Sequence, residues 1–219
     1  MKKIIGFTMA EVLITIGIVG VISALTIPTL MFKINEKRTV TKLKTTQSIL
    51  SRALKMAEEE NGDIEGWNLI GHNEESAKNA ANKLKPFLKL ALDCSSLTQK
   101  KCYPKIDYKY LNGRDYSDLY NGLVGNYHMI LLNGSAITVL ISTLLEDEGL
   151  MLFVDLNGEK GPNVWGRDLF AFTYYNHNLA PAGNAKYRPY KTTCKLTNTG
   201  VGCAYYVINF GKMDYLKNK

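Results

Sequence analysis

An oxygen-rich segment, residues 155–168, contains the side chains best suited to hold a metal ion. Carboxylate, amide and backbone oxygens are the ligands that Ca²⁺ prefers. The EF-hand pattern is not met, because Gly158 comes two residues early and Gly166 stands in place of the bidentate Glu. Tight turns at Asn-Gly and Gly-Pro account for the same residues without a metal. We therefore expect no cofactor and keep calcium as the alternative. The candidate calcium ligands are Asp155, Asn157, Asn163 and Asp168.

The three histidines, His72, His128 and His177, are scattered along the chain, with no second ligand at metal-binding spacing. The G-x-S-x-G, P-loop and G-x-G-x-x-G motifs are also missing. We predict no catalytic residue and no enzyme activity, and we interpret the histidines as solvated or hydrogen-bonded surface residues. A hydrolase triad assembled from distant residues would be revealed by histidines that converge on a cleft.

The net charge of +7 is carried by the two ends of the chain. Residues 33–185 hold 18 basic and 18 acidic side chains, whereas residues 186–219 hold seven basic side chains and one acidic one. Basic and aromatic residues alternate there, a mixture typical of phosphate-binding and base-stacking surfaces. We favour a solvated face balanced by acidic runs elsewhere, and nucleic acid is a possible partner. The residues concerned are Lys186, Tyr187, Arg188, Tyr190, Lys191 and Lys195.

Residues 7–32 form a long apolar run in which Glu11 is the only charged side chain. As a helix rising 1.5 Å per residue the run is about 39 Å long, more than the roughly 30 Å of a bilayer core. The sequence predicts one membrane-spanning helix. Lys2 and Lys3 place its N-terminus in the cytoplasm. A cleavable secretory signal fits worse, because residues 22–24, Ile-Ser-Ala, put a bulky side chain where cleavage prefers a small one.

The four cysteines form two close pairs, neither with the C-x2-C spacing of a zinc site. Four cysteines allow three disulfide connectivities, which sequence alone does not separate. The predicted topology places them outside the cytoplasm, where disulfides persist. We expect local pairing because short loops close at small entropic cost. The expected bonds are Cys94–Cys102 and Cys194–Cys203.

Glu11 has no basic residue three or four positions away in its own helix. A carboxylate inside a membrane span is unfavourable and is by default a functional residue. We therefore expect its partner to come from another chain.

Residues 6–16, GFTMAEVLITI, resemble the processing motif of type IV prepilins and of type II secretion pseudopilins. The resemblance covers Gly6 to about Leu30 and is specific, since Gly6, Phe7, Glu11 and Pro28 all fall in register. Ala10 departs from it, because a larger aliphatic residue is common there. The resemblance implies that a prepilin peptidase cuts after Gly6 and methylates Phe7.

The same resemblance implies roles in assembly. Glu11 would pair with the N-terminal amine of a neighbouring subunit, and Pro28 would kink the helix. The partners would be the peptidase, other pilin or pseudopilin subunits and an inner-membrane assembly platform. The protein would start as a single-pass inner-membrane precursor with its head in the periplasm and would end in a filament outside the cytoplasm.

Beyond residue 32 the helical period continues with one apolar face. Val40, Leu43, Gln47, Leu50, Leu54 and Ala57 recur at spacings of three and four, which predicts a helix ending at Asn61-Gly62. A second helix is predicted from an Asn73 N-cap, with Leu88 and Leu92 on its apolar stripe and a kink or break at Pro86.

Three segments predict β-structure. Residues 129–141 read as a hairpin with a type I′ turn at Asn133-Gly134. Residues 150–154 and 169–175 are two further strands. The fold class is α+β, with an antiparallel sheet packed on the second half of a long, pilin-like N-terminal helix.

The expected organisation is a leader at residues 1–6, a transmembrane and assembly helix at 7–32, its amphipathic continuation at 33–62 and a head at 63–219. We expect a structural subunit of a type IV pilus or a type II secretion pseudopilus. The alternatives are a minor pilin for DNA uptake that binds nucleic acid and, less favoured, a single-span membrane-anchored hydrolase.

Overall fold

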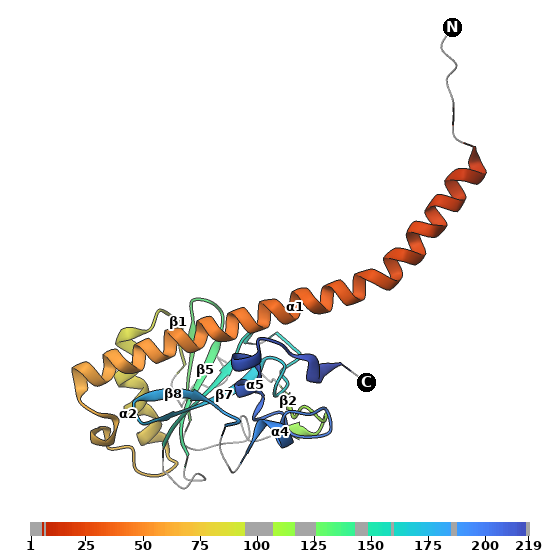
Figure 1. Ribbon diagram of the computed structural model, residues 1–219. Coiled ribbons are helices and arrows are strands. Elements are labelled where there is room, and N and C mark those ends of the chain that lie inside the picture. The colour runs from red at the N-terminus through yellow and green to blue at the C-terminus, as the bar shows by residue number, and fades with distance from the viewer. Residues whose placement is uncertain are drawn as a thin grey trace. The chain divides into compact units, whose positions relative to one another are not determined.

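The computed structural model describes residues 6, 8–94, 107–116, 126–142, 149–158, 160–184 and 188–217 (Figure 1). The chain divides into two compact units, Met1–Arg38 and Thr39–Lys219. Helix α1 (Met9–Asn61) contributes to both units. The unit boundary falls inside this helix.

The first unit consists of the N-terminal part of α1 and the residues that precede it. Its large apolar side chains, among them Leu13, Ile16 and Leu25, are exposed. The helix is long and apolar enough to cross a membrane, and its most apolar window is not buried at all. Helical structure continues through Pro28.

The second unit begins with the amphipathic part of α1. The predicted apolar stripe is confirmed, because the side chains that this part of the helix buries recur at spacings of three and four. Gln47, on the same stripe, is half-buried and donates a hydrogen bond from Nε2 to the carbonyl of Leu179. The buried residues are Val40, Leu43, Thr46, Leu50, Ala53, Leu54 and Ala57.

The predicted end of this helix is also confirmed. Helix α1 ends at Asn61, and Gly62 adopts a φ of +77°, the left-handed conformation that glycine takes without a Cβ penalty. A 3-10 turn, η1 (Ile64–Trp67), follows and buries the Trp67 ring.

Helix α2 (Glu74–Leu84) begins at the predicted N-cap. Asn73 Oδ1 accepts a hydrogen bond from the Ser76 amide, 2.9 Å away. The helix ends before Pro86, which lies in the 3-10 turn η2 (Lys85–Phe87). The predicted stripe was wrong beyond this point, because Leu92 lies in strand β1 (Leu90–Asp93) and not in a helix.

The head contains an antiparallel six-stranded sheet with the order β1-β4-β5-β6-β7-β8, which confirms the α+β class. Both predicted single strands are present, as β6 and β7. Two short strands, β2 (Tyr108–Lys109) and β3 (Asp115–Tyr116), pair with each other. The remaining strands of the large sheet are β4 (Asn126–Leu131), β5 (Ala136–Ser142), β6 (Gly149–Asp155), β7 (Leu169–Tyr175) and β8 (Asn178–Pro181).

The hairpin β4–β5 is confirmed, but its predicted turn type is wrong. Only Gly134 has a positive φ, +76°, whereas a type I′ turn requires positive φ at both central residues. Gly134 N donates to the Leu131 carbonyl and Leu131 N donates to the Ser135 carbonyl, each at 2.9 Å. This is a type I turn closed by a glycine bulge.

The two edge strands of the large sheet are short. Strand β1 has four residues and a register shift between Leu90 and Leu92. Strand β8 also has four residues, ends at Pro181, and contains the Leu179 carbonyl that Gln47 contacts.

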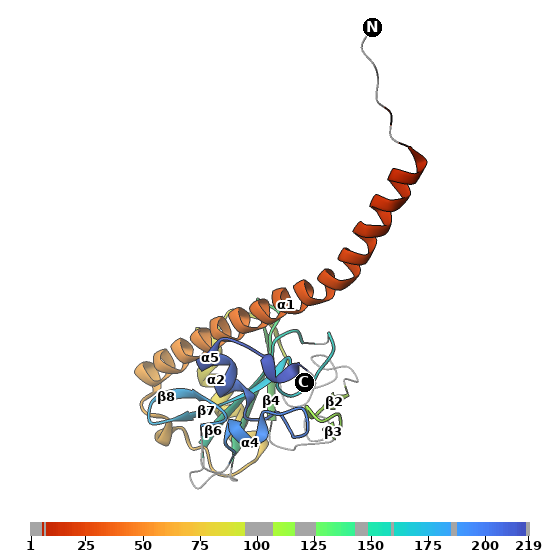
Figure 2. The same ribbon diagram turned by 45° about the vertical axis from the view of Figure 1, so that its right-hand side comes forward.

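The C-terminal segment closes over β7 and β8. It contains α4 (Tyr190–Thr193), α5 (Cys203–Phe210) and η3 (Asp214–Leu216), and α5 packs against both strands (Figure 2). The backbones of Gly183 and Gly202 approach closely, since a Cβ on Gly183 would lie 2.1 Å from the Gly202 carbonyl oxygen. Cys203, Ala204 and Val207 of α5 join the core that also contains the buried face of α1.

Candidate functional site

Glu11 stands at the start of α1, where its carboxylate has a partner that the sequence interpretation missed. Glu11 Oε2 accepts hydrogen bonds from both the backbone amide and the hydroxyl of Thr8, each 2.8 Å long. The Glu11 amide in turn donates to Thr8 Oγ1 at 3.3 Å. This is a capping box, and the Thr-x-x-Glu spacing in the sequence predicts it. Glu11 is therefore hydrogen-bonded within its own chain by a neutral residue, and its pairing with the amine of a neighbouring subunit stays a prediction.

Two threonines in the apolar half of α1 bond their hydroxyl groups within the helix. Thr15 Oγ1 donates to the Val12 carbonyl and Thr26 Oγ1 to the Ile22 carbonyl, both at 2.9 Å. Such internal bonds remove the penalty of placing a hydroxyl in hydrocarbon. Pro28 lies inside this half of the helix, as the sequence placed it, and Gly6 precedes its first turn. Phe7 is outside the described residues.

The candidate calcium ligands lie close together between β6 and β7, but their oxygens accept hydrogen bonds from the protein. Asp155 Oδ1 accepts from the amides of Asn157 and Gly158, and Oδ2 accepts from the Tyr108 hydroxyl. Asp168 accepts from the amides of Asn163 and Val164 at 2.7 and 2.6 Å.

The two asparagines of this loop also serve as donors. Asn157 Nδ2 donates to the Gly161 carbonyl at 3.0 Å. With its amide nitrogen facing the loop, Asn163 donates to the carbonyls of Gly158 and Lys160. A calcium ion would have to displace these bonds, so the residues fit a self-bonded turn better than a calcium site.

Burial makes this loop sensitive to pH. Burial raises the pKa of Asp155 to about 7, against the hydrogen bond from Tyr108, and burial also raises the pKa of Asp168. A carboxyl whose pKa is higher in the folded state stabilises the fold at low pH, and that contribution is lost as the pH rises toward 7. His128 makes the opposite contribution, because burial lowers its pKa to about 4. As the pH falls below 6.5 the unfolded chain takes up this proton first, so the folded state loses stability.

The Asp155→Asn variant should isolate the carboxyl contribution. Between pH 7.5 and 5.5 the free energy of unfolding of the wild type should rise by about 2 kcal/mol relative to the variant, because only the wild type binds the extra proton. The contribution of His128 cancels in this difference. Denaturant unfolding of both proteins at the two pH values measures it, and parallel pH dependence would contradict the assignment.

The cysteine prediction is confirmed where the structure describes both partners. Cys194 and Cys203 form a disulfide that ties α4 to the start of α5. Cys94 is also disulfide-bonded, at the end of β1. Cys102, its expected partner, is outside the described residues.

The three histidines have separate hydrogen-bond partners. His72 Nδ1 lies 2.7 Å from the Ile141 carbonyl, and His128 is buried with its Nδ1 2.9 Å from Thr138 Oγ1. A surface position is therefore wrong for His128. The imidazole of His177 is largely exposed in the turn between β7 and β8.

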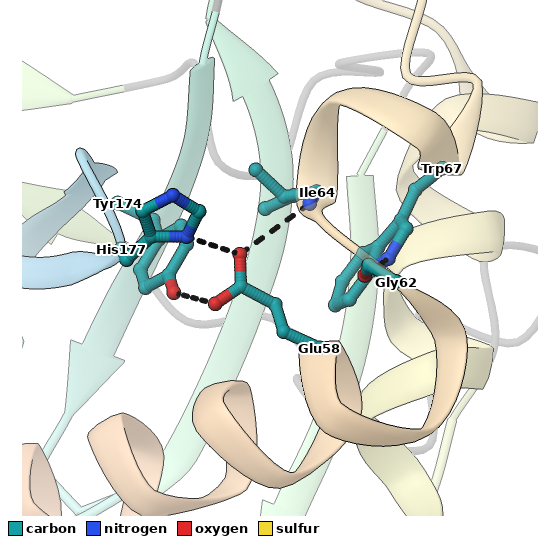
Figure 3. A network of polar contacts seen from close by, with 6 residues as sticks. All are labelled: Glu58, Gly62, Ile64, Trp67, Tyr174 and His177. Carbon is teal, nitrogen blue, oxygen red and sulfur yellow. Dashed lines mark hydrogen bonds and ion pairs between the residues drawn. The ribbon is translucent and has the colours of Figure 1, made fainter.

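Glu58 joins three parts of the head through hydrogen bonds (Figure 3). Its Oε2 accepts a 2.5 Å bond from the Tyr174 hydroxyl on β7, and its Oε1 lies 3.2 Å from His177 Nδ1 and 3.4 Å from the Ile64 amide. Burial is the larger cause, and the neighbouring Glu58 carboxylate the second cause, of a pKa of Tyr174 above its ordinary value. Sequence reasoning missed this network because Tyr174 and His177 are more than a hundred residues from Glu58 in the chain.

The predicted basic surface is described in part. Arg188, Lys191 and Lys195 are exposed, whereas Lys186 and Tyr187 are outside the described residues. Tyr190 is half-buried and packs against Tyr205, at 5.2 Å between ring centroids, and against two other aromatic rings of α5. A ring held in this cluster has less surface free for stacking on a base.

The comparisons with known proteins identify a family without a described activity. No curated protein and no solved structure matches the chain. Residues 29–204 match the family described as "Family of unknown function (DUF6613)". The matched region begins after most of the apolar half of α1 and includes the whole of the large sheet. Since it covers well over half of the 219 residues, the chain belongs to this family of unknown function.

Proposed function

We propose that the protein is a pilin-like structural subunit, matured by a prepilin peptidase and polymerised through α1 into a type IV pilus or a secretion pseudopilus. The observation that carries the proposal is the continuity of α1. Its first part exposes an apolar surface long enough to cross a membrane, and its second part buries one face in an α+β head. The same helix therefore supplies a membrane anchor and the support of the head.

The N-terminal residues support the same function. Gly6 and Phe7 stand at the expected cleavage point, and Glu11 lies in the first turn of α1. Cleavage would create a free amine about 6 Å along the helix axis from the Glu11 carboxylate. In a low-dielectric bundle of helices, a carboxylate is strongly attracted to an amine from a staggered neighbour.

Maturation is the most direct test of the proposal. The native protein should begin at Phe7 with a methylated amine, as intact-mass analysis would show. The Gly6→Val variant should keep its full length, because a branched side chain obstructs close approach to the cut bond. Gly17→Ala, where an added Cβ meets nothing within 4 Å, is the matched control and should be processed normally. A native start at Met1, or after Ala24, would contradict the proposal.

Binding of nucleic acid is the second candidate function, favoured by the exposed side chains of Arg188, Lys191 and Lys195. The full chain in detergent can be titrated with labelled single-stranded DNA at low and at physiological salt. We expect weak binding or none at physiological salt. If phosphates are bound, neutralising Lys186, Arg188, Lys191 and Lys195 together should reduce the salt slope by roughly 3 to 4 units. Micromolar, salt-sensitive binding that this variant loses would favour DNA uptake.

A further inference from the structure

We propose that Glu58, Asp63 and His177 form a surface binding site for a divalent transition-metal ion of the zinc class. Each of the three residues offers one ligand atom, and these atoms lie within 4.8 Å of one another. The site is independent of the N-terminal helix surface on which the proposed function rests.

The three ligands come from separate segments that the fold brings together. Glu58 lies in the last turns of α1, Asp63 immediately precedes η1, and His177 occupies the turn between β7 and β8. Figure 3 shows the Glu58 carboxylate between the Tyr174–His177 side and η1. The bond from Tyr174 fixes one carboxylate oxygen, and the other faces His177 and also accepts the long bond from the Ile64 amide. Such a bond orients a ligating carboxylate.

One imidazole and two carboxylates select the class of metal. Zinc binds histidine nitrogen and carboxylate oxygen at about 2.0–2.2 Å, which brings ligand atoms to about 3.3 Å from one another in a tetrahedral site. Asp63 and the His177 imidazole are exposed and free to rotate over the remaining distance. Water would complete the coordination. Ca²⁺ and Mg²⁺ prefer oxygen ligands alone, so the imidazole disfavours them.

The local charge favours a cation. Among the residues that the structure describes, no lysine or arginine forms an ion pair with Glu58 or Asp63. Lys83 donates instead to the side-chain oxygen of Asn61. Glu59, Glu60 and Glu65 add three further carboxylates within seven residues of Glu58 in the chain, so this segment is rich in negative charge.

The backbone of the β7–β8 turn provides a variant that removes the ligand without harming the fold. Asn176 and His177 have φ values of 47° and 56°, and Tyr175 pairs with Asn178 across them. This is a two-residue type I′ turn, in which glycine is the preferred second residue. His177→Gly therefore relieves backbone strain while deleting the imidazole, so we expect this variant to stay folded, as its melting temperature without metal would show.

The test is a titration of the metal-free full chain in detergent, without a histidine tag, by isothermal calorimetry with Zn²⁺ and in parallel with Ca²⁺. We expect one saturable Zn²⁺ site, at least about tenfold weaker in His177→Gly and in Glu58→Gln. His72→Asn, which removes a half-buried histidine bonded elsewhere, is the matched control and should bind Zn²⁺ as the wild type does. Zn²⁺ should also raise the melting temperature of the wild type and not that of His177→Gly.

Three outcomes would overturn the proposal. They are the absence of saturable Zn²⁺ binding in the wild type, unchanged affinity in His177→Gly, and equal affinity for Ca²⁺ and Zn²⁺. The last result would mean that the carboxylates act without the imidazole.

Discussion

The Glu11→Ala variant should remain in the membrane at wild-type level or above and should be missing from sheared filaments. Removing an intramembrane carboxylate relieves an unfavourable transfer, which is about 2.5–3.5 kcal/mol at the centre of a span and smaller near its end. Assembly should fail because the amine of the neighbouring subunit loses its partner. Quantitative immunoblots of membrane and filament fractions measure the two effects separately.

The Glu11 carboxylate caps the first turn of α1 and, in our proposal, also pairs with the amine of a neighbouring subunit. A control must separate these two roles. Thr8→Ala removes the hydroxyl that bonds Glu11 and leaves the carboxylate in place. The lost cap should weaken the first turn by about 1 kcal/mol and leave assembly intact. Glu59→Ala, an exposed acidic residue in the head half of α1, controls for loss of charge. Glu11→Ala subunits at wild-type level in filaments would contradict the assembly role.

The Gly183→Ala variant should lose about 3–5 kcal/mol of the free energy of unfolding. Its φ of +122° is strained for any residue with a side chain, and its Cβ would lie 2.1 Å from the Gly202 carbonyl oxygen. Because the atoms that this Cβ would meet all belong to the Gly202 backbone, which cannot rotate aside, the segment that carries α4 and α5 would have to move away from β8. Thermal unfolding of the full chain, followed by circular dichroism, measures the loss.

Gly113→Ala is the matched control for this prediction. Gly113 also has a positive φ, +84°, but an added Cβ there meets nothing within 4 Å. Its substitution should show the backbone strain alone, about 1–2 kcal/mol. Equal destabilisation by the two variants would mean that the close approach of Gly183 and Gly202 contributes nothing.

Local patterns in the sequence predicted the elements whose signals are local. The end of α1 at Asn61-Gly62, the cap at Asn73 and strand β7 depend on neighbouring residues, and all three were predicted. Strand β1 was assigned to a helix because Leu88 and Leu92 are four residues apart, and only pairing with β4 decides its conformation. The capping box at Glu11 also has a local signal, Thr-x-x-Glu, but its hydrogen bonds come from a neutral residue, whereas the prediction for Glu11 concerned a charged partner.

The metal candidate shows where sequence reasoning ends. The histidines were interpreted as unrelated to a metal because none has a second ligand at metal-binding spacing in the chain, yet His177 meets Glu58 across 119 residues. The type I′ turn expected at Asn133-Gly134 occurs instead at Asn176 and His177. Sheet pairing and helix packing bring these residues together, and no short-range pattern encodes either.

The short edge strands affect whether the heads of several copies can pair with one another through their sheets. An exposed strand edge is a template for pairing with another copy, and heads held side by side would meet at very high local concentration. Both edges are poor templates for such pairing. Strand β1 has a register shift, and strand β8 ends at Pro181 and has one carbonyl already bound by Gln47. In the filament that we propose, these features would protect neighbouring heads against fusing into a continuous β-aggregate, and a polymer joined only through helices would stay reversible and could be dismantled into intact subunits.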